Sequence, residues 1–184
     1  MKPAGFWRFS GGFFLLAAWM NYLDSQGVVP MAFLACALHE AGHYLAVRRL
    51  GGSVRYIQFT AAGAEMRVEG ELSYQREWIC ALAGPAANLL LAAFFCVFPW
   101  GTLFAGINLA RALLNLAPVS GLDGGRALRC GLCLLAGEET AGRAARALDT
   151  LCCALLLGLG CSVLGIAGNP TLLLVAVWVW AAQQ

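Results

Sequence analysis

The sequence has 184 residues, of which 60% are hydrophobic and only 12% are charged. A soluble domain usually carries about twice that charged fraction. The formal net charge of +2 is too small for a nucleic-acid-binding surface, and no basic stripe or nucleic-acid motif accompanies it. Because the apolar residues come in long runs, the composition indicates an integral membrane protein that contacts the lipid bilayer and binds no nucleic acid.

The first apolar run has the outline of a signal peptide, since Lys2 and Arg8 lie at its start. No small-residue cleavage site follows it, so we expect a retained first segment. A cleaved signal is the alternative.

Apolar segments along the chain predict about six transmembrane helices, although the first and last are short for the roughly 20 residues that a span needs. The apolar stretch 122–135 contains two arginines, and we interpret it as a continuation of the fourth segment after a break. The six segments are residues 6–23, 28–48, 78–99, 102–119, 146–167 and 170–182.

Two polar connections, residues 49–77 and 136–145, carry or adjoin most of the remaining arginines. By the positive-inside rule, these connections and both termini are expected in the cytoplasm. The second segment then has its last residues toward the cytoplasmic side.

Residues 54–69 do not have a helical pattern. Side chains alternate in character from Val54 to Thr60, and the AAGA sequence that follows supplies a turn, so we predict two short strands. The expected fold class is therefore an all-α polytopic membrane protein with a small membrane-associated β-hairpin, forming one domain over residues 1–184 with its core at about 28–136.

The only two histidines of the chain, His39 and His43, lie four residues apart in the sequence HEAGH, with Glu40 beside the first. Residues four apart share one face of a helix. This spacing is typical of two zinc ligands with a carboxylate as general base. A solvated helix face is the alternative, but ionisable residues inside a membrane usually mark function.

A catalytic zinc ion takes three protein ligands and keeps one open position, so the third ligand must be a carboxylate or a thiolate. Asp123 is the strongest candidate, because Pro118 breaks the preceding helix and the glycines around Asp123 permit an unwound chain. A helix cap at the membrane surface is an equally good interpretation from spacing alone.

Three motifs in this order, HEAGH at 39–43, AGPAAN at 83–88 and NLAPVSGLDGG at 115–125, resemble the site-2 protease family of intramembrane zinc metalloproteases. The resemblance covers about residues 30–135 and is greatest to the compact branch that includes stage IV sporulation protein FB. Small residues fill the spacer 119–121, where bulkier ones are common in the family. No PDZ or CBS domain is expected.

The resemblance implies that His39, His43 and Asp123 bind one Zn²⁺ per chain and that Glu40 is the catalytic acid and base. It implies a multi-pass protein of a bacterial plasma membrane, or of a sporulation membrane. The distribution of arginines then predicts an active site toward the cytoplasm. Its substrate would be a membrane-tethered protein such as a regulator or sigma-factor precursor, and other membrane proteins would regulate it.

Two asparagines have less certain roles. Asn115 is interpreted either as a contact to the substrate backbone or oxyanion or as a helix–helix hydrogen bond. Asn88 follows several small residues, so we interpret it as part of close helix packing. The strands at 54–69 could pair with an extended substrate through a free edge, or serve as a plain anchoring loop.

Two other classes of function compete with a protease. A pseudoprotease, zinc scaffold or transporter would be expected to have lost Glu40 or to have gained a second polar cluster. A membrane thiol oxidoreductase would use Cys130 and Cys133, whose spacing is typical of redox pairs. These two cysteines lie among leucines, and we interpret them as small buried hydrophobic residues.

Overall fold

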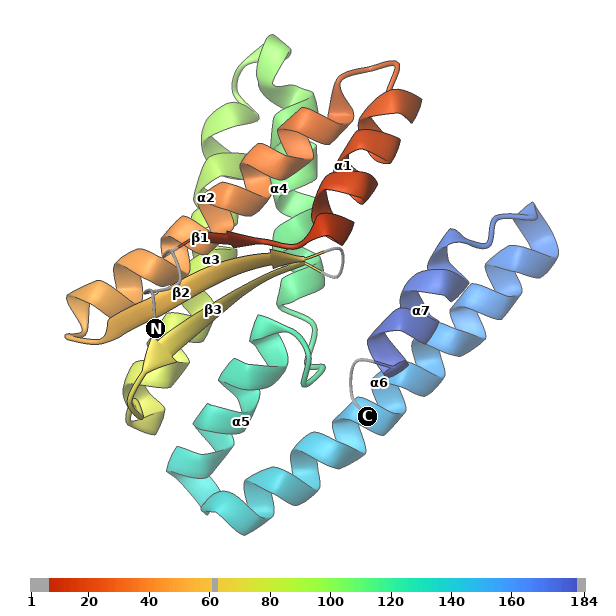
Figure 1. Ribbon diagram of the computed structural model, residues 1–184. Helices are drawn as coiled ribbons and strands as arrows, with labels where there is room; N and C mark the ends of the chain where they lie inside the picture. Colours follow the sequence, from red (N-terminus) through yellow and green to blue (C-terminus); the bar gives the residue numbers. More distant parts are fainter. Residues whose placement is uncertain (1–6, 61–62, 182–184) are drawn as a thin grey trace. The chain divides into compact units, whose positions relative to one another are not determined.

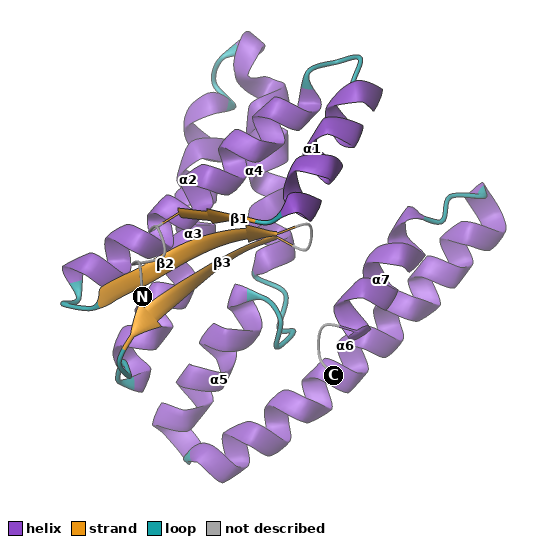
Figure 2. Cartoon of the chain, in the orientation of Figure 1, coloured by secondary structure: helices purple, strands orange, loops and turns teal. Residues whose placement is uncertain are grey.

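The computed structural model describes residues 7–60 and 63–181 and is mostly helical, with one small sheet (Figures 1 and 2). The chain divides into two compact units, residues 1–113 and 114–184, which are described separately. The elements of the first unit are β1 (Trp7–Phe9), α1 (Gly11–Leu23), α2 (Val28–Arg49), β2 (Ser53–Thr60), β3 (Gly63–Glu69), α3 (Tyr74–Phe95), a 3₁₀ turn (Pro99–Gly101) and α4 (Thr102–Asn115), whose last residues cross into the second unit. Those of the second are α5 (Asp123–Ala136), α6 (Glu138–Ala167) and α7 (Thr171–Ala181).

The predicted hairpin is present as β2 and β3, which pair in antiparallel fashion with Ile57 opposite Met66. A third strand, β1, pairs in parallel with β2 and was not predicted, because its residues were assigned to the first apolar segment. Aromatic side chains join the two strands: the ring of Phe9 stacks on that of Phe59 with centroids 5.1 Å apart. The guanidinium of Arg8 lies 3.9 Å from the ring centroid of Tyr56, within cation–π range.

The order of the sheet is β1-β2-β3, so β2 has a paired strand on each side. Of the strands predicted at 54–69, β2 is therefore paired with β1 at residues 57–59, whereas β3 lies at an edge of the sheet. Among the described residues, the outer edges of the sheet belong to β1 and β3.

Two helices of the described chain, α3 and α6, are long and apolar enough to cross a membrane, whereas the sequence predicted about six spans. Four others are shorter than a span requires, with 13 residues in α1, 14 in α4, 14 in α5 and 11 in α7. The first segment is shortened because Ser10 caps α1, its hydroxyl oxygen accepting the N–H of Phe13 at 3.1 Å. The fourth is interrupted because α4 ends at Asn115. Helix α2 has 22 residues, but charged and imidazole side chains reduce its hydropathy.

The predicted polar connection 136–145 is wrong, since only Gly137 separates α5 from α6. Gly137 adopts φ 80°, a conformation that favours glycine, and α6 begins directly afterwards with Glu138 and Glu139 in its first turn. Acidic side chains at a helix N-terminus interact favourably with the helix dipole. Residues 138–145 thus form the first turns of the helix that contains the fifth segment.

Within the second unit, α6 packs against both α5 and α7. Val119, in the loop between α4 and α5, is buried together with Cys153 of α6. The same loop is fastened by Asp149 of α6, whose carboxylate accepts the backbone N–H of Ser120 at 2.7 Å and also its hydroxyl. This loop leads directly into Asp123, so α6 fixes the start of α5.

Candidate metal centre

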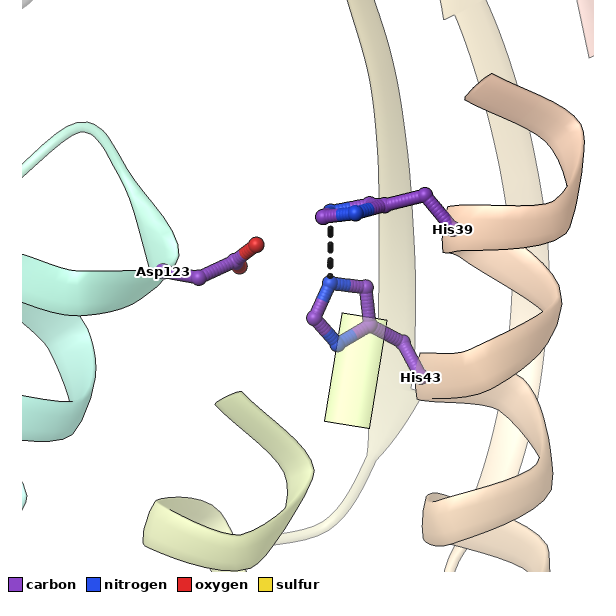
Figure 3. A group of neighbouring side chains, drawn as sticks. All are labelled: His39, His43 and Asp123. Atoms are coloured by element: carbon purple, nitrogen blue, oxygen red, sulfur yellow. Dashed lines mark hydrogen bonds between the residues drawn. The ribbon is translucent and has the colours of Figure 1, made fainter. Parts of the chain in front are cut away.

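Helix α2 places the two histidines on one face, as their spacing predicted. The Nε2 atoms of His39 and His43 lie 3.1 Å apart (Figure 3), and the two rings are nearly perpendicular, at 83°. His39 is 2% exposed, and His43 is half-buried. The two side chains therefore converge through one nitrogen each, which leaves Nδ1 of each ring for other partners.

The Nδ1 atom of His43 is held by helix α3. It lies 2.7 Å from the backbone carbonyl oxygen of Cys80, which can only accept, so Nδ1 carries the proton and donates it. Pro85 lies inside α3 and has no N–H for the carbonyl of Ala81, which loosens the helical ladder at this turn. A neutral His43 thus presents an Nε2 lone pair.

The Nδ1 atom of His39 lies 2.5 Å from Oδ1 of Asn88, which is also on α3. The amide nitrogen of Asn88 donates to the carbonyl of Ala35 at 3.2 Å, so its oxygen is the atom that faces His39. His39 consequently donates from Nδ1 as well. The sequence placed Asn88 in helix packing only, and no local pattern indicated its contact with a histidine 49 residues away.

These contacts leave two Nε2 lone pairs facing each other at 3.1 Å. Two acceptors repel at this distance unless a proton or a metal ion lies between them, and a further proton would place a positive charge in a buried site. Two nitrogens at 2.0–2.1 Å from a tetrahedral zinc ion are about 3.3 Å apart. The donor chemistry and the spacing therefore both fit a metal ion.

Gly84 of α3 keeps the space in front of these nitrogens open. A Cβ at this position would overlap Nε2 of His43 and lie 2.8 Å from Nε2 of His39. Gly42, between the two histidines, permits the close approach of the helices, since its Cβ would lie 2.7 Å from the carbonyl oxygen of Ala83. The two glycines together allow α3 to pack closely against the face of α2 that carries the histidines.

Asp123 is the first residue of α5, and the N-cap position is occupied by Leu122. Asp123 is therefore not the cap residue that the alternative interpretation required. Gly124 and Gly125, which follow it, are buried, and a Cβ on either would overlap backbone atoms of the loop that precedes α5. The break at Pro118 was predicted correctly, and it sets Asp123 at a tightly packed helix start.

The proposed catalytic residue, the proposed substrate contact and the cysteine pair lie on three different helices. Glu40 lies on α2 next to His39 and is half-buried, and Asn115 is the last residue of α4. Cys130 is buried in α5, with Cys133 half-buried one turn later, both as free thiols. Of the predicted residues, the structure thus brings His39 and His43 together within the first unit, while Asp123 belongs to the second.

No protein-family model matches the sequence. The chain is 28% identical over 193 residues to the "Putative zinc metalloprotease Rip3" of two strains of Mycobacterium tuberculosis, covering 95% of this chain and 48% of each relative. The chain thus spans about half the length of these curated relatives.

Among solved structures, the fold is similar to that of the site-2 protease from Methanocaldococcus jannaschii, with a TM-score of 0.70. The match has 21% identity and covers 97% of this chain and 89% of that one. The protein therefore has the fold of a site-2 protease. The chain is thus similar in sequence to proteins described as zinc metalloproteases and similar in fold to a site-2 protease. The compact, sporulation-related branch stays a prediction.

Proposed function

We propose that this chain is an intramembrane zinc metalloendopeptidase that hydrolyses a peptide bond in or near the transmembrane segment of a membrane-tethered protein. The observation that carries the proposal is the convergence of the two Nε2 atoms at 3.1 Å, with Nδ1 of each ring next to a hydrogen-bond acceptor on α3. The relatives' description as a zinc metalloprotease supports zinc as the metal and peptide hydrolysis as the reaction.

One zinc ion per chain would be bound by His39 and His43 of the first unit and by Asp123 of the second, the three side chains drawn in Figure 3. Two imidazoles and one carboxylate make up a donor set that catalytic zinc uses, with the fourth position open. The close packing of Gly124 and Gly125 against the loop before α5 supports a fixed position for the carboxylate.

A bound zinc ion supplies an acidified water and stabilises the oxyanion that develops on the scissile carbonyl. In our proposal Glu40 is the general base that accepts a proton from the attacking water, and it returns that proton to the leaving nitrogen. Its position on α2 beside His39 supports this role. Asn115, at the end of α4, is proposed to contact the substrate backbone or the oxyanion.

A membrane location is supported by large apolar side chains that face outward. Helix α1 buries none of its residues, and Leu15 and Tyr22 are 75% and 83% exposed, as are Leu90 of α3 at 72% and Ile166 of α6 at 88%. A soluble surface rarely exposes so much apolar area. We propose a multi-pass protein of a bacterial plasma membrane in which the shorter apolar helices complete the spans and the active site opens toward the cytoplasm.

The orientation can be tested with a reporter tag at residue 100, between α3 and α4. We expect it on the side opposite the cytoplasm, and a cytoplasmic signal would overturn the orientation while leaving the chemistry intact.

A helical substrate hides its carbonyls in its own hydrogen bonds, so it must become extended before it is cleaved. The outer edge of β3 could pair with such a segment, because strand addition needs an edge with unpaired backbone groups. The other side of β2 is less available, because β1 pairs with its residues 57–59.

The decisive experiment measures zinc per chain and cleavage of a membrane-tethered test protein by the purified, reconstituted chain. We expect about one zinc ion in the wild type, retained in Glu40→Gln but lost in His43→Ala and Asp123→Ala, and cleavage only by the wild type. Cleavage by Glu40→Gln would overturn its role as the base. A folded wild type without zinc would favour a pseudoprotease.

A further inference from the structure

Behind His39 lies a pair of fully buried asparagines that the catalytic proposal does not use. Asn88 of α3 and Asn108 of α4 are both 0% exposed. The amide nitrogen of Asn88 donates to Oδ1 of Asn108 at 2.7 Å, and the amide nitrogen of Asn108 donates to the carbonyl of Phe104 at 2.8 Å. The four groups form a line of hydrogen bonds from a helix backbone to an imidazole ring.

The direction of this line is set by backbone carbonyls, which only accept. The carbonyl of Phe104 requires the nitrogen of Asn108 to face it, which turns the oxygen of Asn108 toward Asn88. The carbonyl of Ala35 likewise requires the nitrogen of Asn88, so both protons of that nitrogen are engaged. The oxygen of Asn88 is left for His39, and exchanging oxygen and nitrogen in either amide would place like groups face to face.

We propose that Asn88 and Asn108 are positioning residues that hold His39 as the Nδ1–H tautomer with its Nε2 lone pair directed at the metal. The inference rests on the proposed zinc site. A ligand histidine binds a metal through one nitrogen, and the hydrogen bond at the other nitrogen fixes which one and orients the ring. Asn108 does not contact His39 directly and orients its ring only by orienting the amide of Asn88.

The two histidines differ in how they are held, and this difference makes the proposal testable within one molecule. His43 is oriented by a backbone carbonyl, that of Cys80, which no side-chain substitution removes. His39 depends on two side chains. A change in the amides should therefore affect one ring and leave the other as an internal reference.

The test compares Asn88→Leu and Asn108→Leu with Ala112→Gly. Leucine branches at Cγ as asparagine does and has no polar atom. Ala112 is also buried on α4, with 0% exposure, and lies one turn after Asn108, so its substitution disturbs the same helix without touching the amides.

Zinc affinity is measured by competition with a chelator, and the imidazole tautomers are measured by ¹⁵N NMR of histidine-labelled full-length protein before and after zinc is added. With only two histidines in the chain, the spectrum of His43→Ala assigns both rings.

In the zinc-free wild type we expect both rings to be protonated at Nδ1. Asn88→Leu should lower zinc affinity by about 10–100-fold and give His39 a mixture of tautomers, with His43 unchanged. Asn108→Leu should do the same to a smaller extent, because Ala35 still orients the Asn88 amide, and Ala112→Gly should leave both readouts as in the wild type.

An Nε2 proton on His39 in the wild type would overturn the proposal, as would unchanged ring signals and affinity in Asn108→Leu. If Asn88→Leu does not fold, the proposal is still tested by the tautomer of His39 in the wild type and by the ring signals and zinc affinity of Asn108→Leu. A folded wild type that binds no zinc would overturn the proposed function, whereas the tautomer of His39 would still test the amide pair.

Discussion

Both carboxylate oxygens of Asp149, on α6, bind a single loop residue, Ser120: Oδ1 accepts its backbone N–H at 2.7 Å and Oδ2 accepts its hydroxyl. Ser120 lies three residues before Asp123, in the loop that sets the start of α5. An acidic side chain on a long helix therefore supports the loop that carries the proposed third zinc ligand, and Val119 adds a buried apolar contact with α6 next to it.

Replacing Asp149 by alanine should loosen this loop without unfolding the helices. The N–H and the hydroxyl of Ser120 would lose their acceptor, at a local cost of about 1–2 kcal/mol. We expect faster amide hydrogen exchange at residues 116–123 and weaker zinc binding. Asp149→Asn, which keeps an acceptor for one of the two groups, should give an intermediate result. Unchanged exchange in Asp149→Ala would show that packing of Val119 alone holds the loop.

Gly84→Ala should weaken zinc binding while the fold is retained. The added methyl group would overlap Nε2 of His43 and crowd Nε2 of His39, so we expect zinc affinity to fall at least about tenfold. Gly106→Ala on α4 is the matched control, because a Cβ there meets nothing within 4 Å and alanine favours a helix by about 1 kcal/mol over glycine. Equal zinc affinity in the two variants would mean that the metal lies elsewhere.

The Asp24 carboxylate, at the start of α2, is expected to make a pH-dependent contribution to the stability of the folded state. The carboxylate of Asp24 accepts the N–H groups of Val29 at 2.8 Å and Gln26 at 3.1 Å. These backbone hydrogen bonds, that of Val29 foremost, hold the pKa of Asp24 below its ordinary value of 3.8. A carboxyl with a lowered pKa in the folded state stabilises that state above its unfolded pKa, and the contribution is lost as the pH falls through the folded pKa.

Asp24→Ala should therefore destabilise the N-terminal turn of α2 at neutral pH and have little effect in strong acid. Hydrogen exchange at the first turn of α2, measured across this pH range, checks the sign. A difference between variant and wild type that grows toward low pH would contradict the assignment.

The parts of the fold that were predictable from the sequence depend on local patterns. The spacing of His39 and His43 determines their common helical face, and Pro118 marks the end of α4 because proline cannot continue the hydrogen-bond ladder. The alternation from Val54 to Thr60 indicated β2 correctly. In each case the signal and the structure lie within a few residues of each other.

The features that were missed depend on contacts between distant residues. The parallel pairing of β1 with β2 joins Arg8 to Gln58, and two aromatic residues flanking an arginine, as at residues 7–9, are equally compatible with the basic start of a membrane segment. The contact of Asn88 with His39 spans 49 residues. The small residues before Asn88 indicated close helix packing, but only the arrangement of the helices shows that the Asn88 amide reaches His39. Glu138 and Glu139 fall in a predicted polar connection, yet they lie in the first turn of α6, where acidic side chains interact favourably with the helix dipole.

Gly125→Ala should test how strictly the start of α5 is fixed. The added Cβ would overlap the carbonyl oxygen of Val119, so either the loop or the helix must move, at a cost of about 1–3 kcal/mol. Asp123 lies two residues earlier and would move with it, so we expect a lower melting temperature together with weaker zinc binding. Gly121→Ala, in the same loop, places its Cβ where nothing lies within 4 Å and should behave as the wild type. If Gly125→Ala lost stability but bound zinc with unchanged affinity, Asp123 would not be a ligand.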